Sequence, residues 1–179
     1  MERRQILKTT GFAATAWLTG FAGCSSSNPD ASEETGTPSN EATNTVLMVT
    51  EGSTYYFDPI GLFVESGETI TFEIDNGSHS ATAYKKGTGG ASVTRIPDGA
   101  KSWDSGILNK QGATFEHTFK TTGTYDYFCI PHKSLGMVGR IVVGEPGGPA
   151  EGSMPPDGKV PESQTIVDQK AVSYSNFSG

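Results

Sequence analysis

The sequence predicts an all-β protein, built as a Greek-key β-sandwich of about seven or eight strands. Three observations support this fold class. Apolar residues occur in short runs that alternate with polar residues, glycine and proline are frequent with 23 and 10 copies among 179 residues, and turn signals separate the runs. A chain of this length suits one domain with tails, because domains contain roughly 100–200 residues.

The expected domain occupies residues 45–146, where five segments have the pattern of strands. These segments are residues 45–50, 69–74, 113–119, 124–129 and 139–143. Turns such as Thr122-Gly123 separate them. Between the second and third segments, residues 85–99 are expected to form an irregular loop, with a helical turn near Trp103.

The N-terminal residues resemble an export signal for a lipoprotein. Paired arginines at positions 3 and 4 precede an apolar stretch that is shorter than the ~20 residues of a membrane span. The segment Phe21-Ala22-Gly23-Cys24 resembles a lipobox, in which small residues precede the cysteine that receives a lipid. We therefore expect residues 1–23 to be a twin-arginine-type signal peptide, and Cys24 to anchor an extracytoplasmic protein to the outer face of the cell membrane. The alternative is an ordinary export signal in which Cys24 occurs by chance.

The two ends of the chain differ in composition from the expected domain. Residues 24–44 are expected to be a disordered, flexible tether, because their Ser, Thr, Pro, Glu and Asn side chains cannot bury enough apolar surface to offset the entropy of ordering. Residues 147–179 begin Gly/Pro-rich and are expected to form an irregular tail, to which the sequence assigns no role. The formal net charge of −7 argues against a nucleic-acid partner, because neutralising phosphates requires clustered Lys and Arg. We expect a monomer.

Residues 129–137 combine three metal-binding side chains in one short loop between two expected strands. A thiolate (Cys129), an imidazole (His132) and a thioether (Met137) lie within these nine residues. One thiolate with two imidazoles and a weak axial thioether suits copper as both Cu(I) and Cu(II). Cysteine and methionine are often buried for packing alone, but a lone thiol in an exported protein is prone to oxidation unless a metal occupies it. The combination therefore predicts a site for one copper ion.

The second imidazole must come from elsewhere in the chain, which has three histidines. His79 follows a turn after an expected strand, and a Greek key can bring such a turn to the same end of the sandwich as residues 129–137. His117 is the competing candidate. It lies two residues from Phe115 and two from Phe119, so all three side chains point to the same face of the strand. The side chain of His117 is therefore expected in the core or at the edge of the sandwich. We predict that His79 is the ligand and that His117 is a packed, hydrogen-bonded histidine.

The segment from Gly123 to Gly139 resembles the copper loop of plastocyanins, pseudoazurins and especially the halocyanins of halophilic archaea, with its Cys-x2-His-x4-Met spacing. The resemblance covers residues 45–144. It implies a blue, type 1 copper protein of the cupredoxin family. The ligands that it implies are His79, Cys129 and His132 as the strong equatorial set and Met137 as the axial ligand.

The same resemblance implies a mobile one-electron carrier. In similar proteins, electrons leave through the edge of the loop histidine, here His132, which reaches the surface inside a ring of apolar residues. Pro131, Leu135 and Gly136 would form part of that ring. The expected partners are transient redox proteins, whose contacts bury less than ~1,200 Å² in total.

Two positions depart from the plastocyanin pattern. Alternation along the strand turns Tyr125, Tyr127 and Cys129 inward and Phe128 outward, and plastocyanins commonly carry a tyrosine at that outward position as a second electron route. The missing hydroxyl argues against this route. Ser80 stands where plastocyanins have an asparagine that ties the two ligand loops together. We predict that Ser80 hydrogen-bonds to the backbone near Cys129 and tunes the potential.

Two other functions compete with electron transfer. A copper enzyme needs further copper ions or an open coordination position, and one unused histidine cannot build a second site, so we expect no enzymatic activity. An extracytoplasmic copper chaperone or storage protein is the alternative, because soft ligands also hold Cu(I). Chaperones favour exposed, methionine-rich sites, and the other methionines, at positions 1, 48 and 154, form no cluster with Met137 along the sequence.

Overall fold

The computed structural model describes residues 44–177. The predicted signal peptide (1–23), Cys24 and most of the predicted tether (24–44) lie outside the described residues. Within the described part, regular structure consists of nine strands, one α-helix and two short 3-10 helices. None of the helices in this part is long and apolar enough to cross a membrane.

The first sheet has four strands in the order β2-β1-β4-β6. Its strands are β1 (Thr45–Glu51), β2 (Thr54–Asp58), β4 (Thr69–Ile74) and β6 (Thr114–Thr118). β1 pairs in parallel with β4, and the two remaining pairs are antiparallel. The alternation of the sequence explains how this sheet packs, because Ile70, Phe72 and Ile74 of β4 are buried while the residues between them are not.

The second sheet has five strands in the order β5-β7-β8-β3-β9. Its strands are β3 (Gly61–Val64), β5 (Thr82–Ala83), β7 (Gly123–Phe128), β8 (Val138–Val143) and β9 (Ala171–Val172). β3 pairs in parallel with β8, and the other pairs are antiparallel. Every residue of β7 and β8 is buried, so both faces of this sheet are covered.

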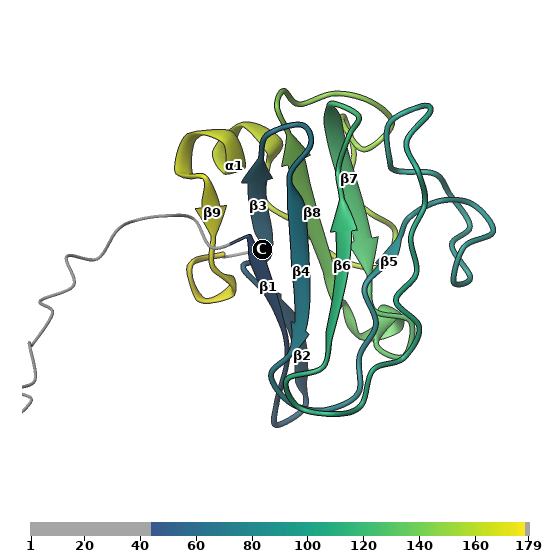
Figure 1. Ribbon diagram of the computed structural model, residues 1–179, viewed down its shortest axis with the longest axis vertical. Helices are drawn as coiled ribbons and strands as arrows, with labels where there is room; N and C mark the ends of the chain where they lie inside the picture. Colours follow the sequence, from purple (N-terminus) through teal and green to yellow (C-terminus); the bar gives the residue numbers. More distant parts are fainter. Residues whose placement is uncertain (1–43, 178–179) are drawn as a thin grey trace, which may run out of the picture. The chain divides into compact units, whose positions relative to one another are not determined.

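The two sheets face each other (Figure 1), and the main apolar core contains side chains from both. Examples are Phe57 and Phe72 from the first sheet and Tyr127 and Ile141 from the second. The parallel pairs β1-β4 and β3-β8 join strands that are not consecutive in the chain, as Greek-key connections do. The predicted all-β sandwich is confirmed.

The C-terminal segment is more ordered than the predicted irregular tail. Residues 144–162 are irregular, but they are followed by α1 (Ser163–Gln169), by β9 at the edge of the second sheet and by the 3-10 helix η2 (Tyr174–Asn176). Isolated apolar side chains along the tail are buried against the domain. Their spacing in the sequence matches neither a strand nor a helix. These buried residues are Ala150, Val160, Ile166 and Val172.

Residues 147–163, here called the C-terminal strap, are joined to the second sheet by a buried ionic cluster. Asp126 of β7 accepts hydrogen bonds from Arg95 at 2.7 Å and from Arg140 of β8 at 2.8 Å. Both guanidinium groups also donate to the backbone oxygen of Ala150 in the strap, at 2.8 and 3.0 Å. Two cations and one carboxylate are thus buried together, and the strap supplies carbonyl oxygens that satisfy the remaining donors.

Two local predictions differ from the structure. The strands β2, β3, β5 and β9 were not predicted. β2 and β3 surround Pro59 and lack a clear alternation, and β5 and β9 contain only two residues each. The predicted helical turn near Trp103 is wrong. Residues 101–103 have no regular structure, the Trp103 backbone oxygen accepts a hydrogen bond from the Ala83 N–H at 3.0 Å, and Trp103 is buried in the core.

Candidate metal centre

Two loops at one end of the sandwich carry the candidate metal ligands. Cys129 directly follows β7, and His132 precedes the 3-10 helix η1 (Lys133–Leu135) in the connection to β8. His79 lies between β4 and β5, where its backbone exchanges hydrogen bonds with Leu108 at 2.9 and 2.8 Å. His79 and Cys129 are fifty positions apart in the sequence, and the crossover between the sheets brings them into contact.

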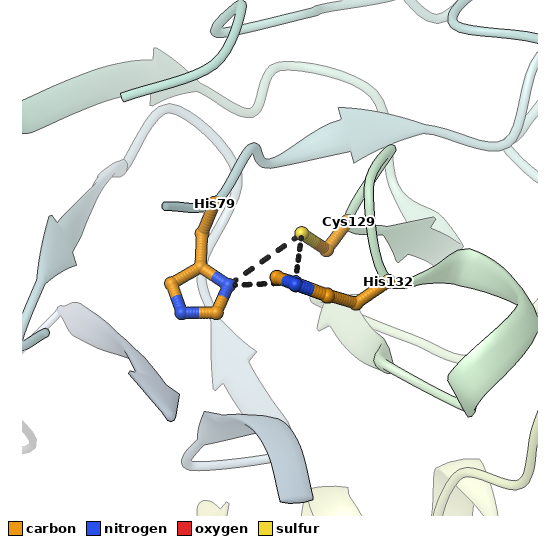
Figure 2. Close-up of side chains that lie close together, drawn as sticks. All are labelled: His79, Cys129 and His132. Carbon is orange, nitrogen blue, oxygen red and sulfur yellow. Dashed lines mark hydrogen bonds between the residues drawn. The ribbon is translucent and has the colours of Figure 1, made fainter. Parts of the chain in front are cut away.

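Three side chains direct their ligand atoms toward one point (Figure 2). The Cys129 Sγ lies 3.6 Å from His79 Nδ1 and 3.5 Å from His132 Nδ1, and the two Nδ1 atoms are 3.2 Å apart. Donor atoms bound to one metal ion in a trigonal plane, with bonds of about 2.0–2.3 Å, lie roughly 3.5–3.8 Å apart. The spacing therefore fits a single ion. A thiolate and two imidazoles are also the equatorial donors that copper accepts in both oxidation states.

Met137 lies beside this triad in sequence and in the fold. Its backbone oxygen accepts a hydrogen bond from the Cys129 N–H at 3.0 Å, and its N–H donates to the oxygen of His132 at 3.3 Å. These bonds close residues 129–137 into a compact loop. The Met137 side chain is fully buried in the same core cluster as Cys129, and its role as axial ligand stays a prediction.

Hydrogen bonds to neighbouring residues orient the ligands. The His79 Nε2 lies 3.0 Å from the Thr50 hydroxyl, which leaves Nδ1 facing the centre. Gly77 makes this approach possible. Its φ is 83°, and a Cβ there would lie 2.4 Å from Thr50 Oγ1 and 3.0 Å from His79 Nε2. A side chain at position 77 would therefore displace the bond that orients His79.

Ser80 links the two ligand loops, as the sequence predicted. Its hydroxyl accepts a hydrogen bond from the Ile130 N–H at 2.8 Å, and its own N–H donates to the Cys129 Sγ at 3.4 Å. Ser80 is fully buried. The prediction of a hydrogen bond between Ser80 and the backbone beside Cys129 is confirmed.

Burial keeps the two histidines neutral in the absence of metal. It lowers the pKa of His79 to about 4, and the charge that His132 could carry acts in the same direction. Burial also lowers the pKa of His132. Burial raises the pKa of the Cys129 thiol, while hydrogen bonds from Ser80 and His132 oppose this rise. At neutral pH both imidazoles are thus ready to bind metal, and only the thiol must lose a proton.

Tyr55 was missed by the sequence reasoning. Its ring stacks on the His132 ring with centroids 3.8 Å apart and planes 9° from parallel. Tyr55 belongs to β2, which was not predicted, so no sequence pattern connected it to the site. The stacking restricts the rotation of the half-buried His132 ring.

Apolar side chains are exposed near the ligand loops. Pro131, Leu135 and Gly136, the predicted ring around His132, are all exposed, and 61% of the Leu135 surface is accessible. Ile107 is 58% exposed and was not predicted. Its neighbour Leu108 pairs with His79, which places Ile107 at the same end of the sandwich.

The remaining histidine is outside the site. The His117 ring stacks on Trp103 at 4.7 Å and meets Phe119 edge-on at 4.8 Å. Its packing is as predicted, but within residues 44–177 no hydrogen bond reaches its ring. Figure 2 shows the three clustered residues, and His117 is not one of them.

The outward-facing Phe128 does not reach solvent. Its ring packs against Tyr84 at 4.5 Å and lies under the Lys133 ammonium at 5.1 Å. Val160 of the C-terminal strap belongs to the same buried cluster. Alternation predicted the direction of the side chain correctly, and the strap covers the face on which it lies.

Comparison with known proteins places this site in context. The family described as copper binding proteins, plastocyanin/azurin family, matches residues 44–144. A chloroplastic plastocyanin from Oryza sativa subsp. indica is 35% identical over 98 residues, which are 55% of this chain and 61% of that protein. A plastocyanin from Sambucus nigra is 30% identical over 103 residues, 55% of this chain and 97% of that protein. A halocyanin from Natronomonas pharaonis is 32% identical over 91 residues, 50% of this chain and 48% of that protein. The C-terminal strap lies beyond the matched residues.

Proposed function

The chain belongs to the plastocyanin/azurin family of copper-binding proteins, and from this premise we propose that it is a mobile carrier of single electrons with one copper ion held by His79, Cys129, His132 and Met137. The triad carries the proposal, because its ligand atoms lie 3.2–3.6 Å apart and come from two separate loops. When bound, copper supplies a one-electron couple between Cu(I) and Cu(II).

The residues around the triad suit fast electron transfer because they hold the ligands in one arrangement. Thr50 orients His79, Ser80 joins the two loops, and Tyr55 packs on His132. His79 and Cys129 are fully buried, so water has little access to the centre. A rigid, dry site needs little rearrangement when the charge changes, which lowers the barrier to transfer.

The exposed apolar residues support a docking surface for redox partners. His132 is the triad member that reaches the surface, and the exposed Leu135 and Ile107 flank the ligand loops. A small apolar contact without charge pairing suits a short-lived complex. Electrons would enter and leave through the exposed edge of the His132 ring.

The location proposed from the N-terminal sequence is extracytoplasmic. A lipid on Cys24 would anchor the domain to the outer face of the cell membrane through a tether of residues 24–44. Fatty-acid labelling in a host that makes lipoproteins tests this directly. We expect label on the exported wild-type protein and none on Cys24→Ala, and label that persists on the variant would contradict anchoring at Cys24.

A chaperone or storage function is the alternative, and burial argues against it. Chaperones exchange metal through exposed ligands, whereas Cys129 and Met137 are fully buried. A copper enzyme would need a coordination position for substrate. The proposed four-ligand set would fill the coordination sphere, so we favour a carrier without enzymatic activity.

A visible spectrum of the copper-loaded protein tests the proposed function. We expect an intense charge-transfer band that vanishes on reduction and returns on oxidation. Cys129→Ser and His79→Ala should abolish the band, while His117→Ala, the matched control, should retain it. A colourless wild-type protein after copper loading, or a band that depends on His117, would contradict the assignment.

A further inference from the structure

A chain of hydrogen bonds connects the ligand loop with a surface carboxylate. The Ile130 N–H donates to the Ser80 hydroxyl at 2.8 Å, and the Ser80 hydroxyl lies 3.1 Å from that of Thr82. The Thr82 hydroxyl donates to Asp104 Oδ1 at 3.1 Å. Ser80 and Thr82 are fully buried, whereas Asp104 is exposed. Two buried hydroxyl groups therefore join the residue after Cys129 to a charge at the surface.

The series of hydrogen bonds has one donor-to-acceptor direction, because the Ile130 N–H at one end can only donate and the Asp104 carboxylate at the other end can only accept. An ionised carboxylate only accepts hydrogen bonds, so the single proton of the Thr82 hydroxyl goes to Asp104. Thr82 must then accept from Ser80, and the proton of the Ser80 hydroxyl is used. The Ile130 N–H is a fixed donor and takes a lone pair of the Ser80 oxygen. Every hydroxyl in the chain is thereby committed, with Asp104 as the terminal acceptor.

Asp104 is itself held in position. Its Oδ1 also accepts a hydrogen bond from the Gly106 N–H at 2.9 Å, and its backbone forms a β-bridge with Thr82. The next residue, Ser105, accepts a hydrogen bond from the Ala81 N–H at 2.9 Å through its hydroxyl. The carboxylate is thus part of a fixed turn rather than a free surface group.

The direction of these hydrogen bonds decides whether the Ser80 hydroxyl can donate to the Cys129 sulfur. Ser80 lies beside the sulfur, because its backbone N–H donates to Cys129 Sγ at 3.4 Å and its hydroxyl accepts from the N–H of the next residue, Ile130, at 2.8 Å. Each hydrogen bond to a copper-bound thiolate withdraws charge from it and tunes the potential of the site. A Ser80 proton that is committed to Thr82 cannot be donated to the sulfur.

We propose that Thr82 and Asp104 are positioning residues that turn the Ser80 hydroxyl proton away from Cys129, leave the Ser80 backbone N–H as the donor from this residue to the sulfur, and so set the copper potential. The inference rests on the proposed function of the triad. The low polarity around the two buried hydroxyls strengthens each bond in the chain. The Asp104 carboxylate acts on the site only by orienting the Thr82 and Ser80 hydroxyl groups.

Thr82→Val tests the proposal, because it removes the hydroxyl with little change of shape. The Ser80 proton then loses its acceptor and turns to the sulfur. We expect a higher reduction potential and a charge-transfer band at higher energy. We also expect a shifted Ile130 amide resonance in the metal-free protein. Asp104→Ala should shift the same three quantities in the same direction, because without the carboxylate acceptor Thr82 can donate its proton to Ser80.

Matched controls distinguish a change in the orientation of the Ser80 hydroxyl from the general effect of removing a hydroxyl or a charge. Thr118→Val removes a hydroxyl from an exposed Thr69–Thr118 pair, and Asp98→Asn removes an exposed charge elsewhere in the connection between β5 and β6. Neither should change the potential. In a Ser80→Ala background, Thr82→Val should cause no further shift, because the proton that it redirects is absent.

Three results would overturn the proposal. They are unchanged potentials in Thr82→Val and Asp104→Ala, a shift of equal size when Thr82→Val is made in the Ser80→Ala background, and a shifted Ile130 amide resonance with an unchanged potential. The amide is read without metal, so an unshifted Ile130 resonance in Thr82→Val contradicts the hydrogen-bond chain alone. A wild-type protein without a copper-dependent band would instead contradict the proposed function.

Discussion

The ring of Tyr55 lies parallel to the ring of His132, with centroids 3.8 Å apart. Tyr55 comes from the β1–β2 hairpin of the first sheet, and His132 comes from the loop between β7 and β8 of the second sheet. The contact therefore joins the two sheets at the candidate copper site. It also covers one face of the imidazole through which electrons are proposed to pass.

Tyr55→Ala should loosen the site, because the stacked pair contributes about 0.5–1.5 kcal/mol beyond the area that it buries. We expect the free energy of unfolding of the metal-free protein to fall by at least this amount, and a chelator to remove copper faster. Urea unfolding and a chelator competition measure the two effects. Tyr55→Phe keeps the ring and should behave as the wild type, and an equal effect in both variants would show that stacking is not the cause.

The structure shows which parts of the site a sequence can reveal. Cys129, His132 and Met137 were recognisable because they are close together in the sequence, and His79 because it follows a turn between strands. Tyr55 and Asp104 were not recognisable. Their roles depend on which strands become neighbours, and neither residue type is a copper ligand.

The C-terminal segment shows the same limit for the fold. Its buried side chains are separated by glycine, proline and charged residues, so they have no period that predicts a packed element. The segment is also held by Arg95, in the connection after β5, and by Arg140 of β8, whose partners in the strap are mostly backbone oxygens. Every residue has a backbone oxygen, so the sequence does not indicate which of these oxygens accept hydrogen bonds from the arginines.

Asp126→Asn tests the buried ionic cluster. The substitution removes the only carboxylate that pairs with Arg95 and Arg140 in a salt bridge among the described residues. Removing one partner of a buried ion pair typically costs about 3–5 kcal/mol, because a charge is left without compensation. We expect a loss of this size in urea unfolding. Asp98→Asn, at an exposed position, should change stability by less than about 0.5 kcal/mol, and equal stability of the two variants would refute the role of the cluster.

Glu151 should make the stability of the strap depend on pH. Burial raises the pKa of this carboxyl, but hydrogen bonds from Ser163 and Thr124 and the charges of Arg140 and Arg95 outweigh it, and the net pKa lies below the ordinary value of 4.5. A lowered pKa means that the stabilisation is present above the ordinary value and is lost as pH falls through the folded value. The effect should be modest because Glu151 is exposed to solvent. Urea unfolding at several acidic pH values should show a shallower decline for Glu151→Gln than for the wild type, and parallel curves would contradict this.

Gly158 brings the strap against the copper loop. A Cβ at this position would lie 2.7 Å from Val138 Cγ2 and 3.1 Å from the Gly136 oxygen. Gly158→Ala should therefore push the strap and the loop apart, lower the stability by about 1–3 kcal/mol and broaden the charge-transfer band. Gly147→Ala is the control, because nothing lies within 4 Å of its Cβ position. If both variants match the wild type in thermal unfolding and in the visible spectrum, the strap does not support the loop.

Met137→Gln tests the predicted axial ligand. A glutamine can occupy a similar volume and offer an amide oxygen, which is a harder donor than a thioether and favours Cu(II) over Cu(I). Copper should stay bound through His79, Cys129 and His132, and the reduction potential should fall. Voltammetry measures the potential, and the band intensity reports whether the thiolate is still a ligand. Met154→Gln is the matched control at a position that is 42% exposed, and it should leave the potential unchanged. If Met137→Gln also leaves it unchanged while the copper remains bound, Met137 is not the axial ligand, and its burial serves only the packing of the core.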